Sequence, residues 1–471
     1  MIPLVEFPTI VKHYGPMFKD VFSEEAFVQF ERYLSGLIVS ENKTVDGINR
    51  LFVEESRNQS SLNRLMTASP FELESLNKAR LKVLDNLPGT RLKSRGVLSV
   101  DNTLLTHYGH EFEQIAKLYD HVTESYVWAH DLVTLHYSDD ETDYPALMQL
   151  WKPAELDKIE AGLRTAQVEF KDGKESLKET APRKWRSYLL RLLQRQQKKH
   201  PELGDLYESK LVIAQQLIQQ WVTAHPGLNL PITFDSWFTQ PAFCRFLDQN
   251  LHLAYVGTLT EKDKVNLKTG SETLKTFAER LKQDHLEAKR RDAQPVFRPI
   301  HINYKGEQKH YYSYCNTHLI HNFGKQRLVI NHDQADLSDN PVFYIGNRLF
   351  WHAEGITRVR RHRWPVEVYY EEGKAEGLDQ YQLRDFSAIQ RHVALVAVAY
   401  SLLRAAQHDP VLRDQLQRQL EITLDGNPAA WRRASQAQSL WCLGLFISTG
   451  LAQGLSLRSL MAPLIQAICR A

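Results

Sequence analysis

Three acidic residues, which follow one another in the order strand, strand and helix, constrain the fold of this sequence most. Residues 96–101 alternate apolar and polar side chains and predict a strand that ends on Asp101. Residues 228–235, after a predicted amphipathic helix, predict a later strand that ends on Asp235. Glu367 lies in a predicted helix that follows a run of strand-like segments. A sheet that pairs the two strands, with the helix across their ends, would bring the three carboxylates together.

This order of elements is typical of an RNase H-like fold. We therefore expect an α/β protein: an RNase H-like catalytic core with a β-rich insertion, a helical N-terminal domain and a helical C-terminal segment. Three converging carboxylates could hold two divalent ions, which activate a water or a 3′-hydroxyl and stabilise the leaving oxygen in an in-line displacement at phosphorus. Each acid also has an ordinary explanation. Asp101 could be a turn residue, Asp235 could cap a short helix, and Glu367 could form a surface ion pair.

Residues 360–374, R-R-H-R-W-P-V-E-V-Y-Y-E-E-G-K, carry the most specific local pattern. Arg363, Glu367 and Lys374 are spaced by four and seven residues, which places them on one helix face. A carboxylate can ligate a hard cation, while Arg and Lys hold phosphate oxygens. The alternative is a solvated helix with ion pairs between successive turns. Glu371, one turn beyond Glu367, is the alternative third ligand.

The pattern of periodic and polar segments divides the chain into five expected parts. These are a helical N-terminal DNA-binding domain, the first part of the RNase H-like core, the β-rich insertion, the catalytic helix of the core with the helix after it, and a helical C-terminal segment, at residues 1–92, 93–260, 261–352, 353–408 and 409–471. Within the insertion, residues 262–294 are polar and charged, and we expect them to form a mobile excursion.

A second basic stretch lies outside these motifs. Residues 182–200 hold seven Lys or Arg side chains, with Trp185 and Tyr188 interleaved. Basic residues alternating with aromatic ones are typical of a nucleic-acid-binding surface, and equally of a solvated helix.

Composition excludes several other classes of protein. The net charge is only +2, so local basic runs must account for any polyanion partner. The four cysteines lack paired spacing, which favours a reducing compartment such as the cytoplasm. The N-terminus lacks a secretory pattern. Residues 440–455 are apolar but too short and too polar for a membrane span, which favours a buried or dimer-forming helix. No phosphate-binding loop motif is present, which argues against ATP use.

The signature around Glu367 resembles that of the DDE transposases of bacterial insertion sequences, and is most similar to the insertion-sequence 701 group of the insertion-sequence 4 superfamily. That group carries Tyr, Arg, Glu and Lys with two, three and six intervening residues. Arg363, Glu367 and Lys374 match, whereas Arg360 stands where the Tyr is expected. Three other stretches are similar to motifs of the group: residues 101–103 (D-N-T), 234–238 (F-D-S-W-F) and 377–392.

The resemblance implies specific roles for these residues. Asp101, Asp235 and Glu367 would be the catalytic residues and would bind two Mg²⁺ or Mn²⁺ ions. Arg360, Arg363 and Lys374 would contact DNA phosphates. An aromatic residue of the β-rich insertion often holds a flipped base in such enzymes, and Phe343 or Tyr344 would do so here; both fit a buried strand equally well.

The same resemblance implies the activity and the partners. The protein would bind terminal inverted repeats and catalyse cut-and-paste transposition through metal-dependent strand cleavage and strand transfer. Its partners would be double-stranded transposon ends and target DNA. It would form a homodimer when two ends are paired, with no membrane involved. A catalytically inactive, domesticated DNA-binding derivative and an RNase H-like structure-selective nuclease are the alternatives.

Overall fold

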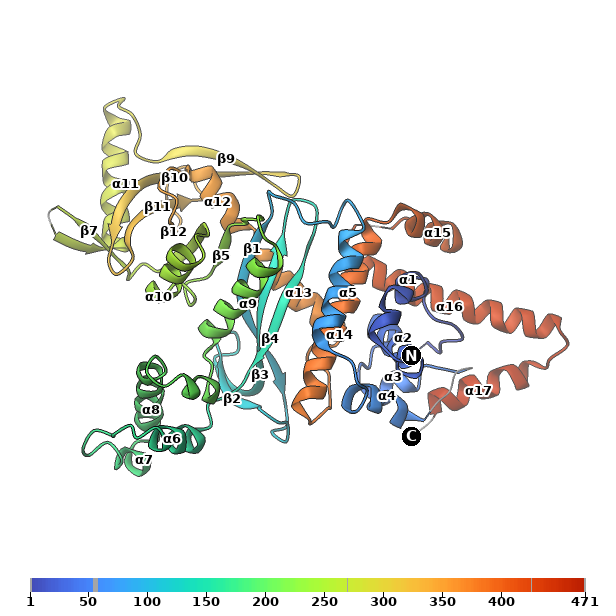
Figure 1. Ribbon diagram of the computed structural model, residues 1–471. Coiled ribbons are helices and arrows are strands. Elements are labelled where there is room, and N and C mark those ends of the chain that lie inside the picture. Colours follow the sequence, from blue (N-terminus) through green and yellow to red (C-terminus); the bar gives the residue numbers. More distant parts are fainter. Residues whose placement is uncertain (1, 54–57, 269, 425, 470–471) are drawn as a thin grey trace.

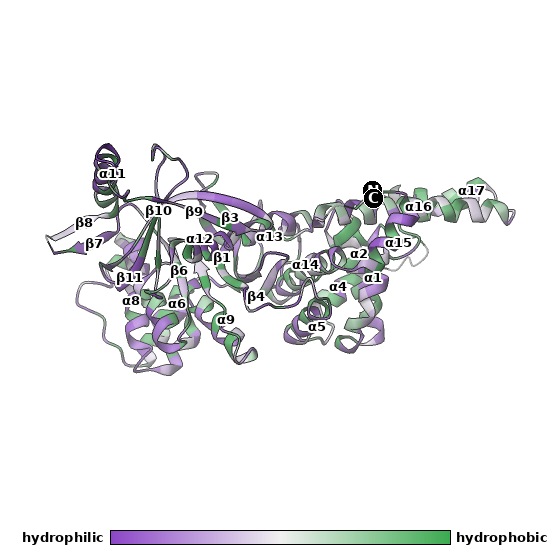
Figure 2. Cartoon of the chain, turned by 90° about the horizontal axis from the view of Figure 1, so that it is seen from above, coloured by the Kyte–Doolittle hydropathy of each residue, from purple (hydrophilic) through white to green (hydrophobic). Residues whose placement is uncertain are grey.

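The molecule is elongated, with a β-rich end, a central sheet covered by helices, and a helical end (Figures 1 and 2). The computed structural model describes residues 2–53, 58–268, 270–424 and 426–469. One large mixed sheet of twelve strands accompanies the helical segments, so the predicted α/β class is confirmed.

The centre of the sheet contains five neighbouring strands in the order β4-β3-β1-β5-β6. Their bounds are Asp143–Trp151, Ser125–Ser138, Val97–His107, Ile232–Phe234 and Tyr255–Leu259. β1 and β4 each pair antiparallel with β3, whereas β5 runs parallel to both β1 and β6. The chain returns from β4 to the parallel strand β5 through helix α9 (Lys210–Ala224), because parallel neighbours need a long crossover. The predicted pairing of the first strand with the later strand is therefore confirmed. The remaining edge strand, β2 (Ala116–Asp120), extends the sheet beyond β3.

The β-rich insertion continues the same sheet. β12 pairs with β6, and β11, β10, β7 and β8 follow outward, while β9 pairs with β10. The bounds of β7 to β12 are Lys264–Leu267, Gly270–Thr273, Arg298–Tyr304, Glu307–Ile320, Gly324–His332 and Val342–Gly346.

The expectation that residues 262–294 form a mobile excursion is wrong. Strands β7 and β8 lead into helix α11 (Leu274–Arg290), whose first turn is capped by the Thr273 hydroxyl. Phe277 and Leu281 of α11 are buried against the sheet. An amphipathic helix with one narrow apolar stripe has a polar average composition, and this average misled the sequence prediction.

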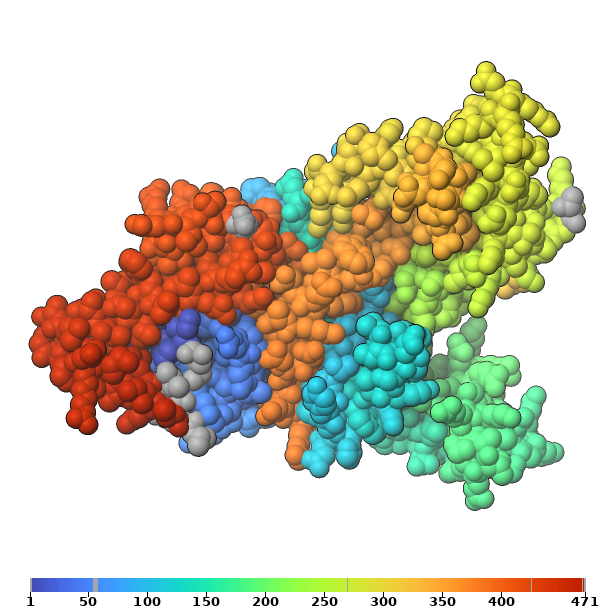
Figure 3. Space-filling model, turned by 180° about the vertical axis from the view of Figure 1, so that it is seen from behind, coloured from blue at the N-terminus to red at the C-terminus, as the bar shows by residue number. Residues whose placement is uncertain are grey.

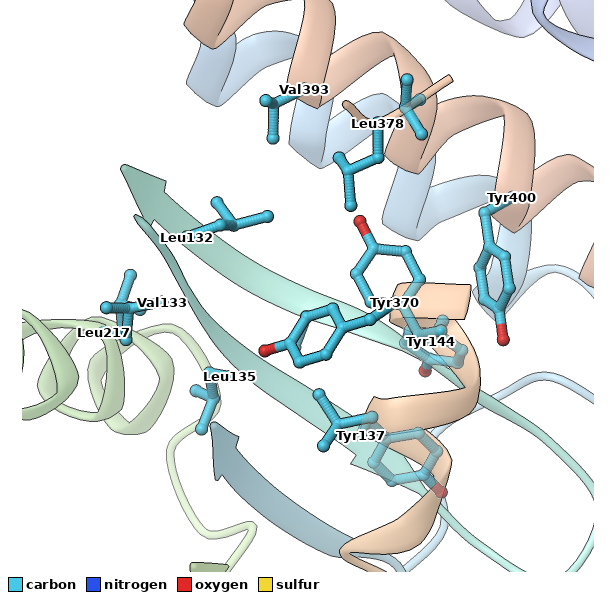
Figure 4. Packing of buried hydrophobic residues seen from close by; sticks show 14 of the residues in the cluster. Leu132, Val133, Leu135, Tyr137, Tyr144, Leu217, Tyr370, Leu378, Val393 and Tyr400 are labelled. Carbon is cyan, nitrogen blue, oxygen red and sulfur yellow. The ribbon is translucent and has the colours of Figure 1, made fainter. Parts of the chain in front are cut away.

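Helices α13 (Trp364–Ala375) and α14 (Phe386–Gln407) cover one face of the central strands. Figure 4 shows Tyr370 of α13 lying between the sheet, at Leu135, and the chain near Leu378. Among the described residues, α14 is the one helix long and apolar enough to cross a membrane, but 78% of its apolar window is buried inside the protein. It is the central helix of the core.

The N-terminal segment is helical, as its periodicity predicts. It contains α1, η1, α2, α3, α4 and α5, at Thr9–Tyr14, Gly15–Val21, Glu24–Val39, Val45–Asn49, Gln59–Thr67 and Leu73–Asp85. Helices α2, α4 and α5 pack against α14, and their apolar side chains belong to the same core as the central sheet. The expected DNA-binding role of this segment stays a prediction.

A small group of helices, which we term the helical module (residues 156–206), lies between β4 and α9. It comprises α6 (Leu156–Thr165), α7 (Leu177–Thr180), α8 (Pro182–Gln196) and η2 (Pro201–Leu206). Its buried side chains form a separate cluster: Ile159, Leu163, Trp185, Leu189, Leu193 and Leu203.

The C-terminal segment is helical, as expected. It contains α15 (Pro410–Leu420), α16 (Pro428–Ala452) and α17 (Leu457–Cys469). Within residues 440–455 the structure separates two faces. Cys442 and Gly450 are buried, whereas Leu440, Trp441, Leu445, Leu451 and Leu455 are exposed. Two further short helices, α10 (Pro241–Arg245) and η3 (Phe246–Asn250), follow β5, and α12 (Ala353–Arg361) precedes α13.

Candidate active site

Asp101 lies in the middle of β1 and not at its end, so that part of the prediction is wrong. The side-chain alternation stops at Asp101, but the backbone ladder with β3 continues as far as the pair His107 and Trp128. A strand is held by its main-chain hydrogen bonds, so it can continue where the apolar pattern is interrupted. Asp101 is only 8% exposed.

Asp235 follows β5 directly, as predicted. The parallel register pairs Val100 of β1 with Phe234, the last residue of β5. Asp101 and Asp235 each follow one member of this pair, and neighbouring strands lie about 4.8 Å apart. One carboxylate oxygen of Asp235 accepts the backbone N–H groups of Trp237 at 3.0 Å and Phe238 at 3.1 Å. Asp235 therefore does not cap a helix, because a turn follows it and α10 begins only at Pro241; one of its oxygens is used within that turn.

Arg363 connects the first and third acids. It precedes α13, and its guanidinium donates from Nη1 to Oδ2 of Asp101 at 2.5 Å and from Nη2 to Oε1 of Glu367. The side chain of Arg363 is 12% exposed and that of Glu367 is 33% exposed. Arg363 and Glu367, four residues apart, thus form an ion pair, as the alternative of a solvated helix predicts. This ion pair is partly buried, however, and Arg363 also binds Asp101.

The charges of the three acids act on one another. Burial raises the pKa of Asp101 to about 7; Arg363 opposes the rise, while the nearby carboxylates of Asp235 and Glu367 add to it. The structure therefore brings the three predicted acids into one electrostatic neighbourhood.

The donor chemistry of this site fits a hard divalent cation, because all three groups are carboxylates that repel one another. Among the residues that the structure describes, no three Asp, Glu, His or Cys side chains are arranged as a preformed metal site. The Arg363 guanidinium supplies the positive charge between Asp101 and Glu367 instead. The role of the acids as metal ligands stays a prediction.

Arg360 reaches the same neighbourhood from α12. Its Nε donates to the Thr258 hydroxyl on β6 at 2.7 Å, and its guanidinium lies 5.8 Å from the centre of the Tyr344 ring. Burial and the charge of Arg363 lower the pKa of Arg360 to about 10, against the opposing effect of Tyr344 and of Asp235 and Asp101. Arg360, which is predicted to contact a phosphate, therefore places a positive charge beside the acids.

Lys374 lies apart from this group. It is in the last turn of α13, and its charge acts on Asp120 of β2 and on Asp379. The predicted single helix face is also interrupted, because α12 ends at Arg361 and α13 begins at Trp364. Arg363 stands at this junction, where its side chain can turn toward β1.

Three other residues named from the sequence are also placed. Glu371 is exposed on α13. Phe343 is buried in the main core at 5% exposure, and Tyr344 is half-buried beneath Arg360. Of the two aromatic candidates, Tyr344 is therefore the one that contacts a predicted phosphate-binding residue, Arg360.

The sequence did not identify Lys210 and Trp237, which adjoin the site. Lys210 of α9 donates to Asp131 at 2.8 Å, and its ammonium group lies 4.6 Å from the centre of the Trp237 ring. Trp237, two residues after Asp235, is 43% exposed. Trp237 could have been found from the sequence, because it lies in the F-D-S-W-F stretch beside Asp235. Lys210 could not, because its approach to the site depends on how α9 packs.

Comparisons with known proteins give a family match and a structural match. A family model described as DDE superfamily endonuclease matches residues 16–271, more than half of the chain, including Asp101 and Asp235. A cryo-EM structure of a piggyBac transposase synaptic complex with hairpin DNA aligns with 94% of this chain and 78% of its own, at 11% identity and a TM-score of 0.35. No curated protein matches the sequence.

Proposed function

The chain belongs to the DDE superfamily of endonucleases, and we propose that it is a DNA transposase of the insertion-sequence 701 type. It would bind terminal inverted repeats, cut the DNA at the transposon ends and join the freed 3′ ends to target DNA. The observation that carries this proposal is that Arg363 binds both Asp101 and Glu367, while the charge of Asp235 also acts on Asp101.

The strand order supports an RNase H-like core. Three antiparallel strands, β4, β3 and β1, are followed by β5 and β6, which run parallel to β1. Two of the acids come from adjacent strands β1 and β5, and the third comes from α13, which contacts β1, β3 and β4. This is the arrangement that the order of the three acids in the sequence predicts.

The three carboxylates would hold two Mg²⁺ or Mn²⁺ ions. When bound, these ions activate a water or a 3′-hydroxyl and stabilise the leaving oxygen. Arg363 would then release the carboxylates and donate its two parallel N–H groups to a phosphate. Phosphate, like carboxylate, accepts two such hydrogen bonds from one guanidinium. Arg360, anchored on Thr258, would contact a phosphate beside the acids, and Lys374 would contact one further along the DNA.

The partners would be double-stranded transposon ends and target DNA, bound at the nucleoid in the cytoplasm. Joining two ends in one event requires two active sites, so the working form would be a homodimer. The exposed apolar side chains of α16, among them Trp441 and Leu445, are a surface that a second copy could cover.

The test is metal-dependent cleavage of DNA that carries the element's ends. Asp101→Asn, Asp235→Asn and Glu367→Gln should each lower cleavage in Mg²⁺ or Mn²⁺ by roughly 10²–10³-fold or more, because each removes a charge that holds the ions. Glu371→Gln, one helical turn away, is the matched control and should cleave like the wild type. Retention of cleavage by the Asp101 and Glu367 variants would remove the assignment.

A structure-selective nuclease of the same fold is the second candidate, because the family match concerns endonuclease chemistry. A strand-joining assay with a pre-cut 3′ end separates the two functions. A transposase joins that end to a second duplex, whereas the nuclease only cuts. Binding of transposon ends without cleavage in either metal would instead indicate an inactive, domesticated derivative.

A further inference from the structure

The helical module (residues 156–206) stands apart from the rest of the protein. It is inserted between β4 and α9 and has its own buried cluster, built around Trp185 and Leu189. Figure 1 shows it projecting beyond the central strands, and Figure 3 shows it as a separate green lobe below the β-rich insertion. The mechanism proposed above gives it no role.

One face of this module is strongly positive. Residues 182–199 contain seven Lys or Arg and no Asp or Glu. All seven are exposed: Arg183, Lys184, Arg186, Arg191, Arg195, Lys198 and Lys199. None of them forms an ion pair with the part of the chain that the structure describes, whereas Glu160 of α6 pairs with Arg164 and Lys178 at 3.0 Å each. The positive charges of α8 are therefore available to bind a negatively charged partner.

Four of these seven cations border a groove of about 760 Å³. Its floor includes Tyr188, Leu177 and Leu192. Six cations line it, against one acid, Glu169: Lys171, Lys174, Arg183, Lys184, Arg191 and Arg195. The Tyr188 hydroxyl accepts the backbone N–H of Lys171 at 2.9 Å, and the Tyr188 ring stacks on Trp185 at 5.6 Å, so the loop and the helix are fixed to each other.

The spacing of the cations suits a regular polyanion. Lys184, Arg191 and Arg195 are seven and four residues apart, which places them along one side of α8. They span eleven residues, or about 16 Å along the helix axis, roughly five base steps of duplex DNA. The two neighbouring lysines of the loop add charge on the same groove.

We propose that this groove binds the phosphate backbone of duplex DNA and is a second DNA-binding site, away from the catalytic acids. The inference rests on the proposed function, which makes DNA the partner. Phosphate contacts of this kind position a protein without reading sequence, so the module would hold the duplex while other elements recognise the ends.

The test compares two variants that lose equal charge. The first is Lys184→Gln, Arg191→Gln and Arg195→Gln, all exposed side chains; the control changes three exposed arginines at the opposite end of the molecule, Arg418, Arg433 and Arg458, to Gln. Binding to a mixed-sequence duplex of about 40 base pairs is measured by fluorescence anisotropy at several salt concentrations. Thermal melting verifies that both variants are folded.

The groove variant should lower the slope of log K against log salt by roughly 3 units and weaken binding about 100-fold near physiological salt, while the control retains the wild-type slope. Equal slopes for the groove variant and the wild type would overturn the inference, and so would an equal loss in the control. In those cases, metal-dependent cleavage by the wild type would leave the proposed function standing. A wild type that neither binds nor cleaves DNA would remove both.

Discussion

At the scale of single residues, Arg363 is the central feature of the site. It donates to both Asp101 and Glu367, and it does so from the junction of two helices. A guanidinium between two carboxylates compensates charges that would otherwise repel in a partly buried place. The same side chain is suited to a phosphate once metal ions compensate the acids.

Replacing Arg363 by Ala should therefore make stability depend on metal. Without divalent ions, the variant should lose about 1–3 kcal/mol of unfolding free energy, because partly buried carboxylates remain without their partner. Added Mg²⁺ should raise the melting temperature of the variant more than that of the wild type. Arg384→Ala, which removes an exposed pair with Glu111, is the control. If Mg²⁺ does not change the melting temperature of the Arg363 variant, Arg363 does not compensate the charges of these carboxylates.

At the scale of elements, a buried ion pair fastens β4 to α14. Asp143 accepts from Arg404 at 2.9 Å and from the Tyr400 hydroxyl at 2.9 Å, and Lys305 of the insertion lies 2.7 Å away. Burial alone would raise the pKa of Asp143, but Arg404, Lys305 and His136 hold it well below 3.8. The contact links strand, helix and insertion.

The sign of the resulting pH dependence follows from this lowered pKa. The contribution of Asp143 is present above the unfolded-state value near 3.8 and is lost as the pH falls through the lower folded-state value. Asp143→Asn should cost about 3–5 kcal/mol at pH 7 and flatten the loss of stability below pH 4. Urea denaturation at pH 7 and pH 3 measures both effects, with the exposed Asp157→Asn as control. An equally steep acid loss in the Asp143 variant would refute the assignment.

Sequence patterns predicted the elements that carry their own periodicity. β1 and β5 were recognised because apolar residues alternate along residues 96–101 and 228–235 with the period of a strand. The acids were found because their types and order are unusual. What the sequence did not show depends on contacts between distant segments: the continuation of β1 past Asp101 rests on pairing with β3, and the Asp101 contact of Arg363 rests on the break before α13.

At the scale of the whole molecule, the two ends differ in chemistry. The β-rich end carries the polar helix α11, whereas α16 and α17 at the other end expose apolar side chains (Figure 2). Trp441 and Leu445 are each 49% exposed on α16. Large exposed apolar side chains gathered on one helix mark a surface for association.

If a second copy covers the stripe of α16 that contains Trp441 and Leu445, charge placed on this stripe should prevent pairing. Trp441→Glu with Leu445→Glu should weaken self-association at least 10-fold, because apolar anchors would become desolvated charges. Sedimentation equilibrium, with and without DNA ends, measures the association. Gln415→Glu, an exposed polar position on helix α15, is the control. Unchanged association of the double variant would place the dimer contact elsewhere.

The central claim is that Asp101, Asp235 and Glu367 together hold divalent ions. Manganese binding, followed by electron paramagnetic resonance with DNA ends present, tests it most directly. The account predicts two bound ions per chain for the wild type and for Glu371→Gln, and loss of bound Mn²⁺ for Glu367→Gln and Asp101→Asn. Equal Mn²⁺ binding by all four proteins would contradict it.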